Sequence, residues 1–143
     1  MEKRGLSIPR YFTEEGIDPY STFEYEERVS ELKNPNGSVL LKIEDVEVPK
    51  GWSQVATDIL AQKYFRKAGV PYKGEGGGVI YGPEKSVRQV AHRLAGCWAH
   101  WGEKYDYFAS EDDVKSFYDE VVFMILKQIA APNSPQWFNT GLA

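Results

Sequence analysis

A serine beside a proline near the end of the chain is the first candidate for chemistry. In the stretch "NSPQWFNTG", residues 133–141, Pro135 fixes its own φ angle and favours an extended backbone at Ser134. This geometry can aim the Ser134 hydroxyl and nearby backbone N–H groups in one direction, and such a set of donors suits a phosphate. The alternative from the residues alone is a Ser-Pro turn followed by a core strand that carries Trp137 and Phe138. Both interpretations remain open at this point.

A second set of candidates, His92, Cys97 and His100, lies on one expected helix. Cys97 and His100 are three residues apart and can share a face, but His92 lies about 12 Å from His100 along the axis at 1.5 Å per residue. These side chains cannot converge on one metal ion without ligands from elsewhere. Cys97 also has no acid-base partner at a fixed spacing, so we expect it to pack as a small apolar group.

Two acidic pairs and a glycine-rich stretch complete the candidates. Neighbouring residues on a helix point about 100° apart, so neither Asp112 with Asp113 nor Asp119 with Glu120 can share one proton. We expect these carboxylates to cap a helix or to lie on its solvated face. The stretch "KGEGGGVIYG", residues 73–82, lacks the strand, loop and helix context of a phosphate-binding loop and is expected to be a flexible connector.

Composition limits the class of protein. The 143 residues have the length of one domain that needs no disulfide for its core. A net charge of -4 without long runs of either sign argues against nucleic-acid binding. The single cysteine and the absence of a signal peptide or long apolar run predict a cytoplasmic protein that does not enter a membrane. Aromatic residues make up 14% of the chain, which predicts a large core or a surface that docks on another protein.

The spacing of apolar residues predicts a mainly α-helical fold with a small antiparallel β-hairpin, in the α+β class. Residues 1–22 are expected to form an irregular arm, because glycine and proline recur there without periodicity. The aromatic residues of this arm anchor it to a neighbour, or the arm is an ordinary ordered tail. Residues 23–48 alternate with period two around the turn "NPNG" and are expected to pair as the hairpin, with Pro49 ending the pairing.

Residues 53–131 carry the helical period, and we expect three helices there. The second helix is expected to have Pro83 in its first turn, and the third to begin at a cap made by Ser110. Pro132 disfavours helical geometry at Ala131, so the third helix is expected to end there and residues 132–143 to leave as an extended or turning segment. The positions expected to face the core are Val55, Ala56, Ile59, Leu60 and Tyr64 in the first helix, Val87, Val90, Ala91, Leu94, Trp98 and Trp101 in the second, and Val114, Phe117, Tyr118, Val121 and Ile125 in the third.

Several stretches together resemble the N-terminal region of ribonucleotide reductases, in particular class II, which uses adenosylcobalamin. The resemblance covers nearly the whole chain and is carried by "IPRYFTEEGIDPY", "VEVPKGWSQ", "WSQVATDILAQKYF", "SVRQVAHRL", "YDYFAS" and "NSPQWFNTG". In this family, a short motif leads into the first strand of a ten-stranded α/β barrel. The motif is Ser-Pro or Thr-Pro, followed by an aromatic residue or leucine, then Phe-Asn and a small residue. The resemblance implies that residues 132–143 begin this strand and that the Ser134 hydroxyl contacts the phosphates of the substrate ribonucleotide.

The resemblance also implies what this chain lacks. Family members carry their redox and thiyl cysteines, with an Asn and a Glu, after the "NSPQWFN" motif, and Cys97 matches none of these positions. The chain alone is therefore expected to be inactive, as one part of a ribonucleoside-diphosphate reductase, with diphosphate and triphosphate substrates both open. Adenosylcobalamin is expected to bind mostly outside this chain. The implied partners are the remainder of the reductase polypeptide or a split-enzyme partner, the ribonucleotide and, in a homodimer, a second copy.

A second class of function remains beside this one. The chain could be a free-standing, non-catalytic binding or regulatory module of reductase ancestry. A reading frame that continues past Ala143 into a strand with a cysteine would favour the first function, whereas a stop codon without a partner gene would favour the second.

Overall fold

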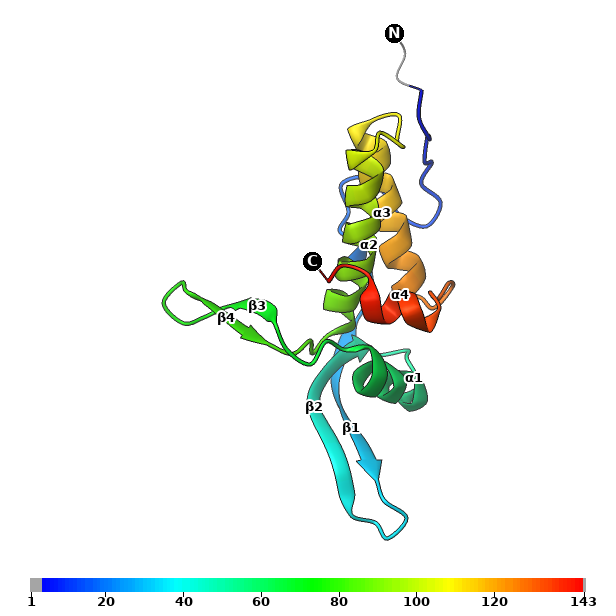
Figure 1. Cartoon of the computed structure of the whole chain (residues 1–143). Coiled ribbons are helices and arrows are strands. Elements are labelled where there is room, and N and C mark those ends of the chain that lie inside the picture. Colours follow the sequence, from blue (N-terminus) through cyan, green and yellow to red (C-terminus); the bar gives the residue numbers. More distant parts are fainter. Residues whose placement is uncertain (1–3, 143) are drawn as a thin grey trace. The chain divides into compact units, whose positions relative to one another are not determined.

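The computed structural model describes residues 4–142, which form two compact units (Figure 1). One unit is Tyr25–Val90, and the other combines the described residues up to Glu24 with those from Ala91 onward. The predicted α+β class is confirmed, because the chain forms helices together with two small antiparallel sheets of two strands each.

The unit Tyr25–Val90 begins with the predicted hairpin. β1 (Tyr25–Lys33) pairs antiparallel with β2 (Val39–Pro49), which confirms both the hairpin and its end at the proline. The predicted turn forms between them: the Asn34 amide donates to the Ser38 carbonyl at 2.8 Å. Gly37 lies in this turn with a φ of 85°, in the left-handed region that favours glycine.

The first predicted helix forms as α1 (Gln54–Ile59), which continues into a turn of π-helix, η2 (Leu60–Tyr64). The expectation that Val55 and Ile59 face the core is wrong, since they are 68% and 41% exposed. The helix turns a more polar side towards β1 instead: Arg28 donates to the Thr57 hydroxyl at 3.1 Å, and the Ser30 hydroxyl donates to Asp58 at 2.8 Å. The buried residues of α1, η2 and the following position are Thr57, Leu60, Ala61 and Phe65.

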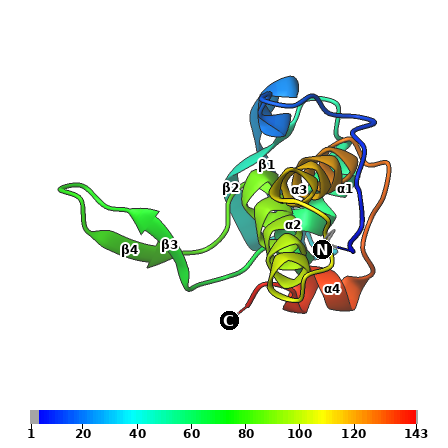
Figure 2. The same cartoon turned by 90° about the horizontal axis from the view of Figure 1, so that it is seen from above.

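A second hairpin follows where the sequence predicted helices and a flexible connector. β3 (Val70–Lys73) pairs antiparallel with β4 (Val79–Gly82), so the expectation of helices throughout residues 53–131 is wrong for this stretch. The glycines make the tight turn of this hairpin: Gly76 and Gly77 both have a φ of 86°, and the Gly74 amide donates to the Gly78 carbonyl at 2.7 Å. Figures 1 and 2 both show this hairpin projecting away from α1 of the same unit.

The other unit is built around two antiparallel helices, α2 (Val87–Lys104), which belongs to this unit from Ala91, and α3 (Glu111–Leu126). Figures 1 and 2 show them side by side. α2 begins at Val87 rather than with Pro83 in its first turn, which corrects that prediction. Trp101, expected to face the core, is 49% exposed. The buried apolar residues of this unit on α2 and α3 are Ala91, Leu94, Ala95, Ala99, Val122, Ile125 and Leu126.

The prediction for the start of α3 is confirmed, and the prediction for its end is wrong. The predicted cap is confirmed, because the Ser110 hydroxyl oxygen accepts from the Asp113 amide at 3.2 Å. The helix ends at Leu126, however, and not at Ala131. Gln128 adopts a left-handed φ of 60° just beyond it, a conformation that commonly ends helices. None of the described helices is both long and apolar enough to cross a membrane.

The acidic pair near the middle of α3 is buried under the N-terminal arm, so the expectation that Asp119 and Glu120 are solvated is wrong. Their exposed fractions are 3% and 7%. Glu120 accepts hydrogen bonds from the backbone amides of Tyr11 and Phe12, the latter at 3.0 Å, and Asp119 forms an ion pair of 2.8 Å with Arg10. Glu120 thus serves as the acceptor for two backbone amides of the arm, and Asp119 for the guanidinium of Arg10.

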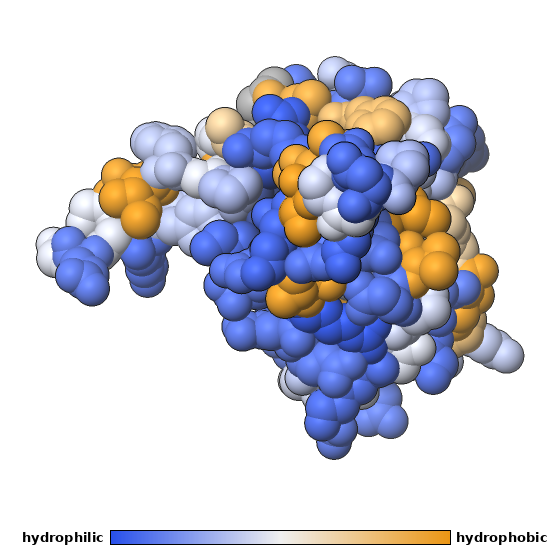
Figure 3. Space-filling model, turned by 90° about the horizontal axis from the view of Figure 1, so that it is seen from below, coloured by the Kyte–Doolittle hydropathy of each residue, from blue (hydrophilic) through white to orange (hydrophobic). Residues whose placement is uncertain are grey.

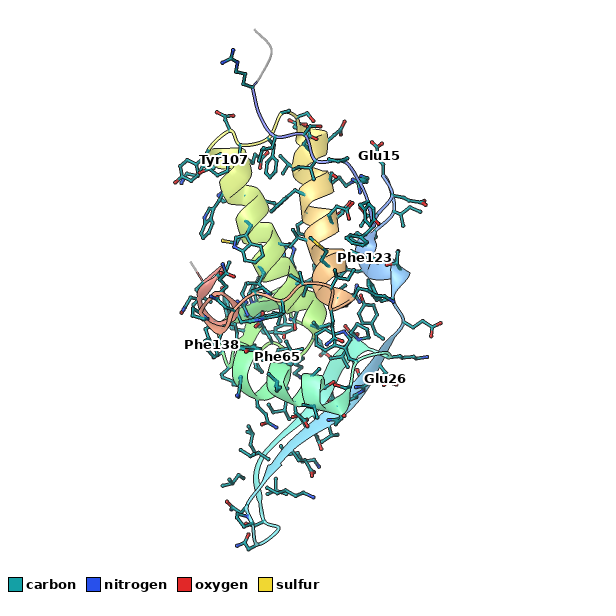
Figure 4. All side chains as sticks on the ribbon, turned by 90° about the vertical axis from the view of Figure 1, so that its right-hand side faces the viewer. Glu15, Glu26, Phe65, Tyr107, Phe123 and Phe138 are labelled. Carbon is teal, nitrogen blue, oxygen red and sulfur yellow. The ribbon has the colours of Figure 1, made fainter. Side chains whose placement is uncertain are left out.

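Aromatic side chains attach the arm to α3 of its own chain. The ring of Phe12 stacks on that of Phe123 with centroids 5.3 Å apart, and Figure 4 shows Phe123 on α3 beside the arm. The Tyr20 hydroxyl, in the short 3-10 helix η1 (Pro19–Thr22), lies 2.8 Å from that of Tyr118. These contacts are those of an ordered tail, and the anchoring of the arm to a neighbour stays a prediction.

Candidate functional site

Ser134 is the first residue of a short helix, α4 (Ser134–Asn139), and its side chain is exposed. The extended residue is its neighbour Asn133, with a φ of -73° and a ψ of 165°, so the expectation of an extended Ser134 is wrong. The side-chain oxygen of Asn133 accepts from the Gln136 amide at 3.4 Å, and Pro135 falls in the first turn, where no N–H partner is needed. "NSP" is thus a helix-start signal that the sequence itself displays. That residues 132–143 lead into a barrel strand stays a prediction.

An arginine that the sequence analysis did not single out holds the far end of α4. Arg93 on α2 donates from Nη1 to the carbonyl oxygens of Trp137 and Thr140, at 3.0 and 2.9 Å. The Trp137 carbonyl lies in the last turn of α4 and the Thr140 carbonyl just beyond its end, where the helix has no further amides to satisfy them. Trp137 is only 8% exposed, so the ring fixes the same helix by packing. Ser134 is therefore presented to solvent on a segment that is anchored at its other end.

The histidines and the cysteine of α2 make separate contacts. Nδ1 of His92 lies 2.7 Å from the Tyr118 hydroxyl, and burial raises the pKa of Tyr118 above its ordinary value of 10.0. Cys97 is a free, half-buried thiol, and His100 is exposed. In residues 4–142 no three His, Cys, Asp or Glu side chains lie together as a metal site would need.

The carboxylate of Asp113 is the polar group at the other end of the same unit. It accepts from the Ile8 amide at 2.7 Å, and the Ser110 hydroxyl donates to it at 2.6 Å. The hydrogen bond from Ser110, followed by that from Ile8, holds the pKa of Asp113 below its usual value of 3.8. Asp113 therefore stays ionised at neutral pH, and its role is structural, since it binds the backbone of the arm at Ile8.

Three hollows among the described residues are modest in size. One of about 300 Å³ lies beside the arm and the first turn of α3, and one of about 280 Å³ is lined mainly by aromatic side chains at the end of α2. The largest that we describe, about 580 Å³, is an open groove between β2, η2 and residues 83–85. Its rim carries the basic residues Lys42, Arg66, Lys67 and Lys85.

Comparison with known proteins identifies the family. A family model described as class II vitamin B12-dependent ribonucleotide reductase matches residues 26–128, most of the chain. The chain belongs to this reductase family. The resemblance drawn from the sequence motifs is thereby confirmed.

Individual relatives carry the same description. The chain is 47% identical to a vitamin B12-dependent ribonucleotide reductase of Agrobacterium fabrum and 45% identical to one of Bradyrhizobium diazoefficiens, with 96% of this chain covered in each case. A third, from Rhodopirellula baltica, is 34% identical over 99% of the chain. Each alignment covers 13% of the relative, so the chain spans about an eighth of the length of these reductases.

The name of these relatives implies that the whole enzyme binds a cobalamin. The hollows described above are too small or too open to hold this cofactor. Sites for drug-sized ligands measure about 300 to 1,000 Å³, and cobalamin is considerably larger than such a ligand. The groove of about 580 Å³ is open, and its lining mixes apolar side chains such as Leu41 and Phe65 with lysine, arginine and carboxylate side chains, so it does not enclose a ligand. We therefore assign the residues of this chain no step that passes through the cofactor.

Proposed function

We propose that this chain is the N-terminal part of a class II ribonucleotide reductase, which reduces ribonucleotides to deoxyribonucleotides for DNA synthesis with adenosylcobalamin. The observation that carries the proposal is the similarity itself, since relatives named vitamin B12-dependent ribonucleotide reductases align with 96% of this chain. The remaining polypeptide, or a split-enzyme partner, supplies the catalytic barrel, its cysteines and most of the cobalamin site. The helices of this chain support that barrel.

Within this function, the Ser134 hydroxyl donates a hydrogen bond to a phosphate oxygen of the substrate ribonucleotide. Its exposed position at the start of α4 supports the assignment, because a buried hydroxyl could not reach a substrate. The anchoring of α4 by Arg93 and Trp137 supports it as well. A contact that is held in place before binding loses less conformational entropy when the substrate arrives.

The substitution Ser134→Ala in the complete reductase tests this assignment. Hydrogen bonds to charged groups contribute about 1.5 to 3 kcal/mol, so KM should rise roughly ten- to a hundredfold. The contact takes no part in the radical chemistry, and kcat at saturating substrate should change much less.

A matched serine provides the control. Ser38 is exposed in the turn between β1 and β2, and Ser38→Ala should leave KM unchanged. If Ser134→Ala binds the ribonucleotide as tightly as the parent enzyme, "NSPQWFN" serves only as a structural helix and the proposed phosphate contact is wrong.

A further inference from the structure

The strand β4 carries three consecutive exposed apolar residues. Val79, Ile80 and Tyr81 are 60%, 58% and 72% exposed. Side chains alternate along a strand, so Val79 and Tyr81 share one face of the hairpin and Ile80 lies on the other. Figure 3 shows apolar residues on this projecting hairpin, and both of its faces therefore expose apolar side chains.

The backbone of β4 also has an open edge. Antiparallel pairs alternate between hydrogen-bonded and non-hydrogen-bonded positions. The bond between Gly74 and Gly78 closes the turn, and the register pairs Tyr72 with Ile80, so Ile80 directs its N–H and C=O towards β3. The same alternation makes Val79 and Tyr81 direct their N–H and C=O groups outward, away from β3.

Other strand edges of this unit carry features that prevent pairing with a further strand. Pro71 occupies the outward-facing position of β3, opposite Tyr81, and has no N–H to offer. β1 and β2 carry charged side chains along their length, such as Glu31 and Lys42. Charges and prolines are the usual protection of edge strands, and β4, "VIYG", has neither. Its outer edge is therefore chemically ready to accept another strand.

The strand that pairs with β4 could come from a second copy of the chain or from another segment of the same polypeptide, and the length of β4 favours the second source. Stable protein interfaces bury about 1,200 to 2,000 Å² in total, which two paired strands of four residues cannot supply. A segment of the same polypeptide avoids most of the loss of translational freedom and can pair over a short edge. The relatives of this chain, of which it spans 13%, have ample sequence for such a segment.

We propose that an uncharged, apolar β-strand from the remainder of the reductase polypeptide pairs with the outer edge of β4 and extends this hairpin to three strands. The added strand accepts from the amides of Val79 and Tyr81, and its side chains lie beside those of β4 on both faces of the hairpin. The inference rests on the proposed function, because the occupant belongs to the rest of the reductase.

Amide hydrogen exchange tests the inference residue by residue. In the 143-residue chain, the Ile80 amide should exchange slowly and those of Val79 and Tyr81 quickly. In the complete reductase, the Val79 and Tyr81 amides should slow by at least about tenfold, while Ile80 stays protected in both. Unchanged exchange at Val79 and Tyr81 in an enzyme that reduces ribonucleotides overturns the strand pairing but leaves the proposed function intact. An enzyme without reductase activity overturns the proposed function instead.

A pair of valine variants sharpens the result. Val79→Lys places a charge beside the edge of β4 and should restore fast exchange at Tyr81 in the complete reductase. Val55→Lys, at a similarly exposed valine on α1, should not. Retained protection of Ile80 shows that the hairpin is intact in both variants. A second copy of the chain as the occupant would overturn the proposal. It would be identified if the Val79 and Tyr81 amides were already protected in the 143-residue chain, if this protection rose with protein concentration, and if sedimentation showed a dimer.

Discussion

Single carboxylates on α3 hold the N-terminal arm, and Glu120 does so by accepting from two consecutive backbone amides. Glu120 is itself only 7% exposed, and Glu120→Ala would leave the part-buried amides of Tyr11 and Phe12 without this acceptor. Such a loss costs about 1 to 3 kcal/mol, so we expect the free energy of unfolding in urea to fall by that amount. Glu120→Gln keeps one oxygen acceptor and should lose less.

The exposed Glu103 on α2 is the matched control, and Glu103→Ala should leave the stability within about 0.5 kcal/mol of the parent. A Glu120→Ala chain that unfolds at the same urea concentration as the parent would show that the carboxylate does not anchor the arm.

At the scale of elements, the loop after α2 folds back because one position of the helix has no side chain. A Cβ at Gly102 would overlap the ring of Phe108, which is 6% exposed. Gly102→Ala should therefore lower the unfolding free energy by about 1 to 3 kcal/mol, although alanine favours helices more than glycine does. Urea unfolding followed by circular dichroism measures this change.

Gly51 serves as the comparison, since a Cβ there meets no atom within 4 Å and its φ is not in the left-handed region. Gly51→Ala should change the stability little or raise it slightly. Equal stability of both variants would mean that Phe108 moves aside without cost and that the close approach to α2 does not matter.

At the scale of the whole molecule, we expect the 143-residue chain alone to show no ribonucleotide reduction with adenosylcobalamin and a thiol. Its sole cysteine, Cys97, is half-buried on α2, and the proposed function places the catalytic cysteines on the remaining polypeptide. Product analysis by chromatography measures the outcome, and addition of the remaining polypeptide should restore turnover. Deoxyribonucleotide formed by the short chain alone would refute the assignment of the catalytic residues to the rest of the enzyme.

Local patterns in the sequence were sufficient for much of this protein. The "NPNG" turn and the cap at Ser110 are confirmed, because hydrogen bonds between residues a few positions apart decide them. The α+β class is confirmed because the spacing of apolar residues along the chain indicates it. The family is confirmed as well, since the motifs quoted above carry it directly. The helix start at "NSP" belongs with these local signals, although Pro135 was interpreted as favouring an extended Ser134.

Only the tertiary structure decided which polar groups are buried. Asp119 and Glu120 have the pattern of a solvated helix face. They are buried because an arm more than a hundred residues earlier in the chain brings the Arg10 guanidinium to Asp119 and backbone amides to Glu120. The contact of Arg93 with α4 has the same origin. The hairpin β3–β4 escaped prediction because its short strands lack a repeating pattern and its glycines are typical of a flexible loop as well as of a turn. A sequence pattern shows which groups can form a hydrogen bond or an ion pair. It does not show which distant segment supplies the partner, because that segment comes close only when the chain folds.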